Sequence, residues 1–161
     1  MNKYAFLDRD GTLIFEPADT CQIDSLEKLK ILPGAIEGLQ KLIEKNYHLI
    51  LISNQDGLGT ASFPRKNFEI AQNKFLKILA ENKIKFSYIF ICPHLPSDDC
   101  ECRKPKIGLV KDFLASNLID KKTSFVCGDR KTDEDFAKNI SLKFIKMQTN
   151  NNFLKAIKSI I

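Results

Sequence analysis

Five short apolar runs, rich in β-branched and aromatic residues, alternate along this chain with segments of helical periodicity. Such runs are typical of buried strands. Strands that alternate with helices need right-handed crossovers, which place the strands in a mostly parallel sheet covered on both faces. The sequence therefore predicts an α/β fold with a doubly wound parallel sheet, a Rossmann-like three-layer sandwich. The five runs are Tyr4–Leu7, His48–Ser53, Ser87–Cys92, Ser124–Cys127 and Lys143–Met147.

Apolar residues at helical spacing predict four helices between and after these strands. The first follows Pro33-Gly34, the second lies between Pro64 and Asn82, the third contains Leu109–Leu114, and the fourth contains Phe136 and Ile140. Two connections are much longer than the rest, and long loops in a compact domain are usually functional. These are Gly11–Leu32 and Pro93–Lys106.

Composition predicts one ordinary globular domain, residues 1–161, with 43% hydrophobic and 28% charged residues. No apolar stretch approaches a membrane span and no signal pattern begins the chain, so we expect a cytoplasmic protein without a membrane partner. The net charge is +5, and the lysines are scattered along expected helices such as Asn67–Lys85 and Lys111–Lys122, where they form solvated faces. Because no dense basic stripe with aromatics is present, we expect no nucleic-acid partner. Nothing in the sequence indicates an oligomeric state.

Carboxylates follow two of the expected strands. Asp8 and Asp10 come directly after the first run, and Asp129 follows the fourth. The carboxyl ends of parallel strands meet at one edge of a sheet, where α/β proteins bind their ligands. Carboxylates gathered there would repel one another without a hard cation, and Mg²⁺ prefers such oxygen ligands. The sequence therefore predicts a Mg²⁺ site that binds a phosphate ester.

The spacing Asp8-x-Asp10 suits a two-step phosphoryl transfer. Asp8 stands where it can attack phosphorus, and Asp10 returns to the same side of an extended backbone, where it can act as general acid and base. An aspartate pair alone could equally form a turn or cap, but Asp129 disfavours that interpretation. Asp133 either caps the following helix or supports the metal ligands.

Neutral and cationic groups complete the expected phosphate site. Ser53 and Asn54 close the second strand with a hydroxyl and an amide, which can hold phosphate oxygens. Lys104, beside Arg103, is a candidate point charge on the transferring phosphoryl group.

Three of the five cysteines and one of the two histidines fall within the eleven residues Cys92–Cys102, at the start of the second long loop. Cys92, His94, Cys100 and Cys102 match a closed tetrahedral zinc site, which would be structural because no position remains open for water. Disulfides are the alternative, but an intracellular chain and the Cys100-x-Cys102 spacing disfavour them. Such a zinc loop would fix Arg103 and Lys104 over the phosphate.

Four pieces together resemble the haloacid dehalogenase superfamily of phosphatases, in that family's order. They are Asp8-x-Asp10-Gly11-Thr12, Ser53-Asn54, Lys104 and Gly128-Asp129-x-x-Thr132-Asp133. The resemblance implies that Asp8 is the nucleophile forming an aspartyl-phosphate and that Asp10 is the general acid and base. It also implies that Mg²⁺ is held by Asp8, by the backbone carbonyl of Asp10 and by Asp129.

The zinc loop is similar to the nearly capless branch that contains histidinol-phosphate and heptose bisphosphate phosphatases. Segments Asn54–Pro64, Cys92–Lys106 and Asp8–Pro17 resemble the phosphatase half of a bifunctional histidine-biosynthesis enzyme, without its dehydratase domain, and so imply a stand-alone histidinol-phosphatase. Histidinol phosphate carries an amine and an imidazole, so Glu16 or Asp56 near the pocket mouth could pair with a cation.

Four other functions compete with this interpretation. A heptose 1,7-bisphosphate 7-phosphatase, or a phosphatase of another small sugar phosphate, would use identical chemistry. A signalling receiver would need neither Asp10 as acid and base nor a zinc loop. A catalytically silent binding domain would have lost the carboxylates that this chain retains. A polynucleotide end phosphatase shares the superfamily motifs, but the missing basic stripe argues against it. We therefore expect a phosphoric monoester hydrolase with a small-molecule substrate.

Overall fold

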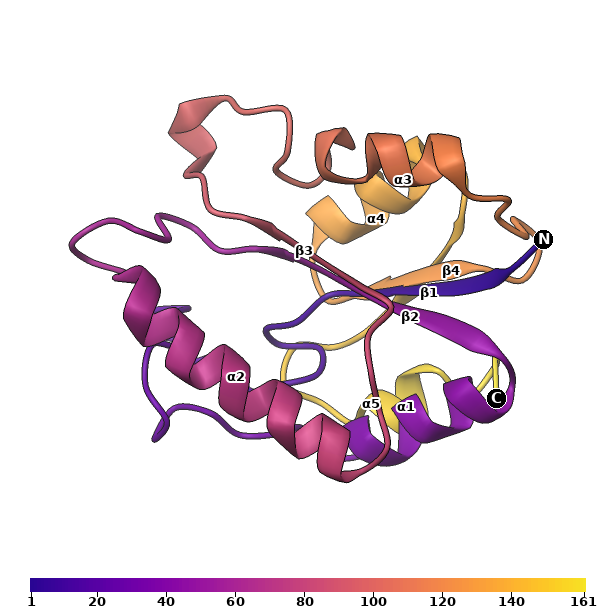
Figure 1. Cartoon of the computed structure of the whole chain (residues 1–161), viewed down its shortest axis with the longest axis horizontal. Coiled ribbons are helices and arrows are strands. Elements are labelled where there is room, and N and C mark those ends of the chain that lie inside the picture. Colours follow the sequence, from indigo (N-terminus) through magenta and orange to yellow (C-terminus); the bar gives the residue numbers. More distant parts are fainter.

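A five-stranded parallel sheet forms the centre of the molecule, in a computed structural model that describes residues 1–161. The strand order is β3-β2-β1-β4-β5, and Figure 1 shows the twist of this sheet. The order reverses between β1 and β4, so the two strands that precede Asp8 and Asp129 are neighbours at the switch point. The strands are β1 (Lys3–Leu7), β2 (Tyr47–Asn54), β3 (Tyr88–Cys92), β4 (Phe125–Gly128) and β5 (Lys143–Lys146).

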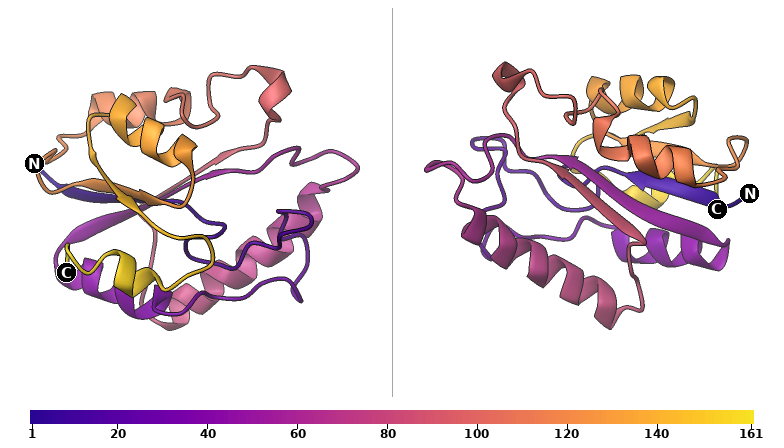
Figure 2. Two further views of the ribbon diagram at one scale, coloured as in Figure 1. Left: turned by 180° about the vertical axis from the view of Figure 1, so that it is seen from behind. Right: turned by 45° about the horizontal axis from the view of Figure 1, so that its top comes forward.

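Helices cover both faces of the sheet, as the sequence predicts for a doubly wound fold (Figures 1 and 2). Helices α1 (Ala35–Glu44), α2 (Arg65–Glu81) and α5 (Phe153–Ala156) lie on one face. Helices α3 (Lys111–Ser116) and α4 (Lys131–Asn139) lie on the other. Short 3₁₀ turns at Pro96–Asp98 and Gly108–Val110 complete the elements.

The side chains of β1 pack alternately against the helices on the two faces of the sheet. Ala5 and Leu7 belong to the larger apolar cluster beneath α1, α2 and α5, whereas Tyr4 and Phe6 belong to the smaller one beneath α3 and α4. Successive side chains of a strand point to opposite faces, so a fully apolar strand fits only a sheet covered on both sides. The three-layer prediction is confirmed.

The third helix is shorter than the sequence suggests. The lysine-rich segment Lys111–Lys122 predicts a helix throughout, but α3 ends at Ser116. Asn117 is extended and its amide donates to the carbonyl of Phe113, which satisfies the end of the helix. The chain then pairs with Asn2 through backbone hydrogen bonds. That expectation was therefore wrong, and so was the omission of α5.

Both long loops lie at the carboxyl edge of the sheet. Residues 11–32 leave β1 and residues 93–106 leave β3, and Figure 2 shows both at the same end of the molecule. No helix is long and apolar enough to cross a membrane.

Candidate active site

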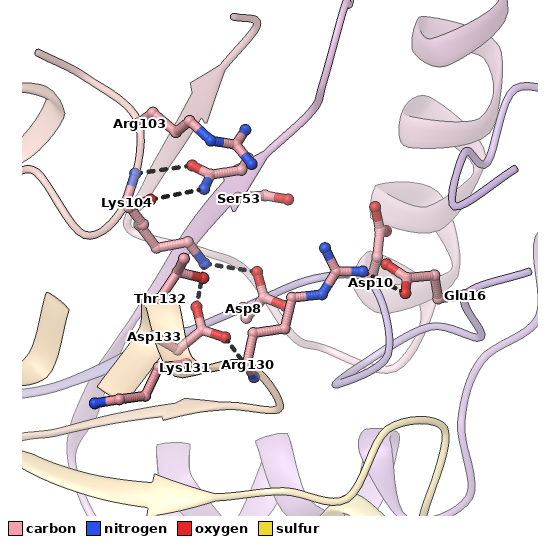
Figure 3. A pocket seen from close by; sticks show the side chains of 11 residues that line it. Asp8, Asp10, Glu16, Ser53, Arg103, Lys104, Arg130, Lys131, Thr132 and Asp133 are labelled. Atoms are coloured by element: carbon pink, nitrogen blue, oxygen red, sulfur yellow. Dashed lines mark hydrogen bonds and ion pairs between the residues drawn. The ribbon is translucent and has the colours of Figure 1, made fainter. Parts of the chain in front are cut away.

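A polar pocket of about 240 Å³ opens at the carboxyl ends of β1, β2 and β4 (Figure 3). None of its lining residues is hydrophobic, which suits a charged ligand and not an apolar one. It brings together seven of the residues expected from the sequence. The lining is Asp8, Asp10, Glu16, Ser53, Asn54, Arg103, Lys104, Arg130, Lys131, Thr132 and Asp133.

Asp8 sits at the end of β1, buried at the floor of this pocket. Its Oδ1 accepts a hydrogen bond of 2.7 Å from Nζ of Lys104. Burial raises the pKa of Asp8 to about 8; Lys104 opposes the shift, and the nearby carboxylates of Asp133 and Asp129 add to it. Added positive charge beside such a carboxyl group would favour its ionised form.

Lys104 is buried and is the cation that contacts the acidic floor. Its Nζ donates to Asp133 at 2.5 Å and to the carbonyl of Ile52 at 2.9 Å, in addition to Asp8. Burial acts to lower the pKa of Lys104, but the carboxylates of Asp133 and Asp8 outweigh it and the net shift is upward. Lys104 is therefore a fixed ammonium held between Asp8 and Asp133.

Asp129 directly follows β4, and its carboxylate lies against the backbone of Gly11. A Cβ at Gly11, which has φ of +76°, would lie 2.6 Å from Oδ2 of Asp129, so only glycine fits there. This Oδ2 accepts from the hydroxyl of Thr149 at 2.7 Å, whereas Oδ1 is buried without a partner. Burial raises the pKa of Asp129.

Oxygen atoms of Asp8, Asp129 and Asp133 lie within 4.8 Å of one another. Three carboxylates with one ammonium leave negative charge uncompensated, and the partnerless Oδ1 of Asp129 is an available ligand. These residues therefore fit a hard divalent cation with oxygen ligands. The side chain of Asp10 is outside this group.

Asp133 combines the two roles that the sequence left open. Its Oδ2 accepts from the backbone N–H of Arg130 at 3.1 Å and so caps α4, while its Oδ1 accepts from Lys104. A Cβ at Gly128 would lie 2.4 Å from the Asp133 carboxyl, so the glycine is what lets the carboxylate reach the sheet edge.

Asp10 is held away from the three-carboxylate group. Its Oδ2 accepts a 2.7 Å hydrogen bond from Nε2 of Gln55, and the same amide donates to Ser53 at 2.8 Å. Its Oδ1 lies 3.3 Å from the guanidinium of Arg9. Asp10 therefore lines the pocket as a carboxyl group separate from the other three.

Ser53 and Asn54 are placed differently from each other. Ser53 is buried at the end of β2 and its hydroxyl lines the pocket. The Asn54 amide instead accepts from the backbone N–H of Lys104 at 3.0 Å and donates to its carbonyl at 3.1 Å. Asn54 therefore fixes the backbone that carries Lys104.

Two pocket-lining arginines each pair with a carboxylate; Glu16 lines the pocket as well, whereas Asp56 lies outside its lining. Arg130 donates to Glu16 at 2.5 Å, and Arg103 contacts both carboxylate oxygens of Asp56. Burial raises the pKa of Glu16, and Arg130 opposes the shift. Glu16 and Asp56 thus each have an arginine partner, which sequence spacing did not indicate.

The second long loop gathers the four residues expected to bind zinc. Sγ of Cys92 lies 3.7 Å from both Sγ of Cys100 and Nδ1 of His94, and Cys102 lies 3.1 Å from Cys92. Zn–S bonds of about 2.3 Å give tetrahedral ligand separations of about 3.7 Å. All five cysteines are free, so the disulfide alternative is not realised. The group fits a tetrahedral metal ion.

The sequence pattern did not single out Arg9, Gln55 or Arg130. Each is adjacent to a predicted site residue: Arg9 lies between Asp8 and Asp10, Gln55 follows Asn54, and Arg130 follows Asp129. Adjacency to the strand ends is therefore the signal that could have identified them.

Curated relatives of this chain are histidine-biosynthesis proteins. The chain is 49% identical over 144 residues to the histidine biosynthesis bifunctional protein HisB of Campylobacter jejuni subsp. doylei, covering 89% of this chain and 41% of that protein. It is 41% identical over 161 residues to HisB of Legionella pneumophila, covering 100% of this chain and 46% of that protein. The chain thus spans less than half the length of these relatives.

Solved structures and a family model place the chain more broadly. The D,D-heptose 1,7-bisphosphate phosphatase of B. bronchiseptica, complexed with magnesium and phosphate, matches with a TM-score of 0.81 and 27% identity over 98% of this chain and 86% of that one. A haloacid dehalogenase superfamily hydrolase from Ehrlichia chaffeensis, 18% identical, shares the fold with a TM-score of 0.62 over 99% of this chain and 97% of that one.

The family model described as polynucleotide kinase 3 phosphatase matches residues 3–150. With that match over most of its length, and with the phosphatase fold and the acidic pocket, the chain belongs to the polynucleotide kinase 3 phosphatase family, a branch of the haloacid dehalogenase-like phosphatases.

Proposed function

We propose that this protein hydrolyses L-histidinol phosphate to L-histidinol and phosphate. The observation that carries the proposal is the 41–50% identity to histidine-biosynthesis bifunctional proteins over 88–100% of this chain. The wholly polar pocket, with a carboxylate opposite a buried ammonium, supports a phosphomonoesterase.

The mechanism proceeds in two steps at phosphorus. Asp8 attacks in line while Lys104 neutralises charge on the transferring group, and Asp10 protonates the leaving alcohol. Asp10 then takes a proton from water, which cleaves the aspartyl-phosphate. Ser53 and Arg103 line the pocket where phosphate oxygens would lie.

Two metal ions are part of the proposal. Mg²⁺ would be held by Asp8, the carbonyl of Asp10 and Asp129, with Asp133 beside them, and would supply positive charge against the phosphoryl oxygens. Zn²⁺ would be held by Cys92, His94, Cys100 and Cys102 as a structural ion. The magnesium and phosphate in the heptose enzyme of the same fold support the first assignment.

The two arginine–carboxylate pairs suggest how a cationic substrate is chosen. Glu16 and Asp56 each face an arginine, so a substrate ammonium would join an existing ion pair instead of an isolated carboxylate. We expect Glu16→Gln to raise KM for histidinol phosphate by more than kcat falls. An unchanged KM would exclude Glu16 from substrate binding.

Phosphate release with Mg²⁺ tests the proposal on three substrates at matched concentrations: histidinol phosphate, heptose 1,7-bisphosphate and a 3′-phosphorylated oligonucleotide. A preference of about 100-fold for histidinol phosphate, or about 2.7 kcal/mol of transition-state binding, is the expected result. Asp8→Asn should abolish turnover on every substrate, which excludes a contaminating phosphatase.

Heptose 1,7-bisphosphate 7-phosphatase activity is the second candidate. The fold match to such an enzyme at a TM-score of 0.81 favours it. A preference for the bisphosphate would keep the mechanism and change the substrate, whereas a preference for the oligonucleotide would replace both candidates.

A further inference from the structure

Arg9 is the largest fully buried side chain of the molecule and has an unusual environment. None of its guanidinium nitrogens has a hydrogen-bond partner. Its two close contacts are Oδ1 of Asp10 at 3.3 Å and the ring of Phe68 on α2, whose centre is 4.7 Å from the guanidinium carbon. A buried guanidinium is costly unless it is paired, so its position next to Asp10 needs an explanation.

The carboxyl group of Asp10 is held from two sides. Gln55 donates to Oδ2, and Ser53 in turn accepts from the same Gln55 nitrogen, which fixes the amide. Oδ1 is buried and has no hydrogen-bond partner, so Oδ2 is the oxygen that can carry a transferable proton, and the Gln55 amide fixes its direction. Arg9 lies at ion-pair distance from Oδ1 without hydrogen-bond alignment, so it attracts this oxygen to the buried side of the carboxyl group.

We propose that Arg9 is a positioning residue that holds Oδ1 of Asp10 on the buried side and so turns Oδ2 toward the leaving-group oxygen. In the first step, the Asp8–phosphorus bond forms as the ester bond breaks, and the departing oxygen takes the proton from Asp10. In the second, the oxygen of water bonds to phosphorus, its proton returns to Asp10, and the bond from Asp8 breaks. The inference rests on the proposed phosphatase chemistry, but not on histidinol phosphate as the substrate.

Substituting Arg9 should therefore harm only reactions that need a proton at the leaving group. The test compares Arg9→Met with wild type on phenyl phosphate, whose leaving group is poor, and on p-nitrophenyl phosphate, whose leaving group departs without a proton. The quantity measured is kcat/KM, which reports steps up to the aspartyl-phosphate. General acid catalysis contributes about 10²–10⁴-fold, so we expect a loss of at least about 30-fold on phenyl phosphate and less than about 3-fold on p-nitrophenyl phosphate.

Controls separate positioning from folding. Gln55→Leu removes the other contact to Asp10 and should show the same dependence on leaving group. Gln72→Leu changes a buried polar residue of α2 that has no partner, and should change neither rate. Arg9→Lys should recover part of the activity on phenyl phosphate. If Arg9→Met does not fold, Arg9→Lys is compared with wild type on the two substrates instead.

Equal losses on both substrates would overturn the proposal, because a structural role does not distinguish leaving groups. Unchanged activity on both would overturn it as well. Failure of histidinol phosphate as a substrate would leave the aryl phosphate comparison intact, so the two proposals fail independently.

Discussion

At the scale of single residues, the acidic floor depends on one buried cation. Lys104 contacts Asp8 and Asp133, and no other ammonium or guanidinium contacts either carboxylate within ion-pair distance. Breaking a buried pair by removing one partner leaves an uncompensated charge, which costs far more than losing an exposed pair.

Lys104→Met should lower the free energy of unfolding by about 3 kcal/mol and turnover by about 100-fold or more. The stability loss should shrink when Mg²⁺ is added, because the ion supplies part of the missing charge. Urea unfolding with and without Mg²⁺ and phosphate release measure the two effects. Lys106→Met is the matched control, since its pairs with Asp99 and Glu101 are exposed, and it should change stability by less than about 1 kcal/mol. Equal losses in both variants would contradict this account.

The positions of side chains that end or directly follow a strand could be predicted from the sequence. Asp8, Asp129 and Ser53 close parallel strands and so meet at one edge. The sequence did not predict the hydrogen bonds between the Asn54 side chain and the backbone of Lys104, or the ion pair between Arg103 and Asp56. Those partners are separated by 50 and 47 residues, and no local periodicity encodes such contacts.

At the scale of elements, the five strands and four of the five α-helices were predictable because each has a strong apolar pattern. Helix α5 was not, since it has four residues and only its Phe153 is buried. The end of α3 was missed because it depends on the backbone pairing of the following segment with Asn2. The loop of residues 93–106 was predictable only through its cysteines and histidine.

This loop should depend on its metal ion for order. Cys92 at the end of β3 and three residues of the loop form the candidate metal group, and Cys102 directly precedes Arg103 and Lys104. The loop itself contributes no buried hydrophobic side chain. Cys100→Ser should therefore lose zinc, lower the melting temperature and reduce turnover, because Lys104 would no longer be fixed. Metal analysis with thermal unfolding measures this. Cys21→Ser alters an exposed cysteine outside the group and should retain zinc and stability; a zinc content of zero in the wild-type protein would exclude the site.

At the scale of the whole molecule, the active site lies where the two halves of the sheet meet. β1 and β4 each deliver an aspartate to the same point, and the sheet order reverses between them. Repulsion among these carboxylates therefore destabilises the folded protein where the two halves of the sheet meet. A cation that binds there raises the free energy of unfolding, because it binds only the folded protein.

Stability should consequently fall as pH rises when no divalent cation is present. Burial raises the pKa of Asp8 from 3.8 to about 8, and the pKa values of Asp129 and Glu16 are raised as well. The folded protein then binds more protons than the unfolded chain between about pH 4 and 8, so the free energy of unfolding decreases across that range. Exposed carboxylates with lowered pKa, such as Asp99 and Asp120, act in the opposite direction but only at more acidic pH.

Mg²⁺ should reverse this trend at pH 8. An ion that binds only the folded protein, at 100 times its dissociation constant, adds about 2.7 kcal/mol, which for a domain of this size raises the melting temperature by about 5–11 °C. Asp8→Asn removes one of the three crowded carboxylates, so its stability without Mg²⁺ should depend less on pH and its gain from Mg²⁺ should be small. Urea unfolding of both proteins at pH 5 to 8, with and without Mg²⁺, measures each effect. If wild-type stability without Mg²⁺ rose with pH, the burial and mutual repulsion of these carboxylates would not govern the stability of the sheet junction.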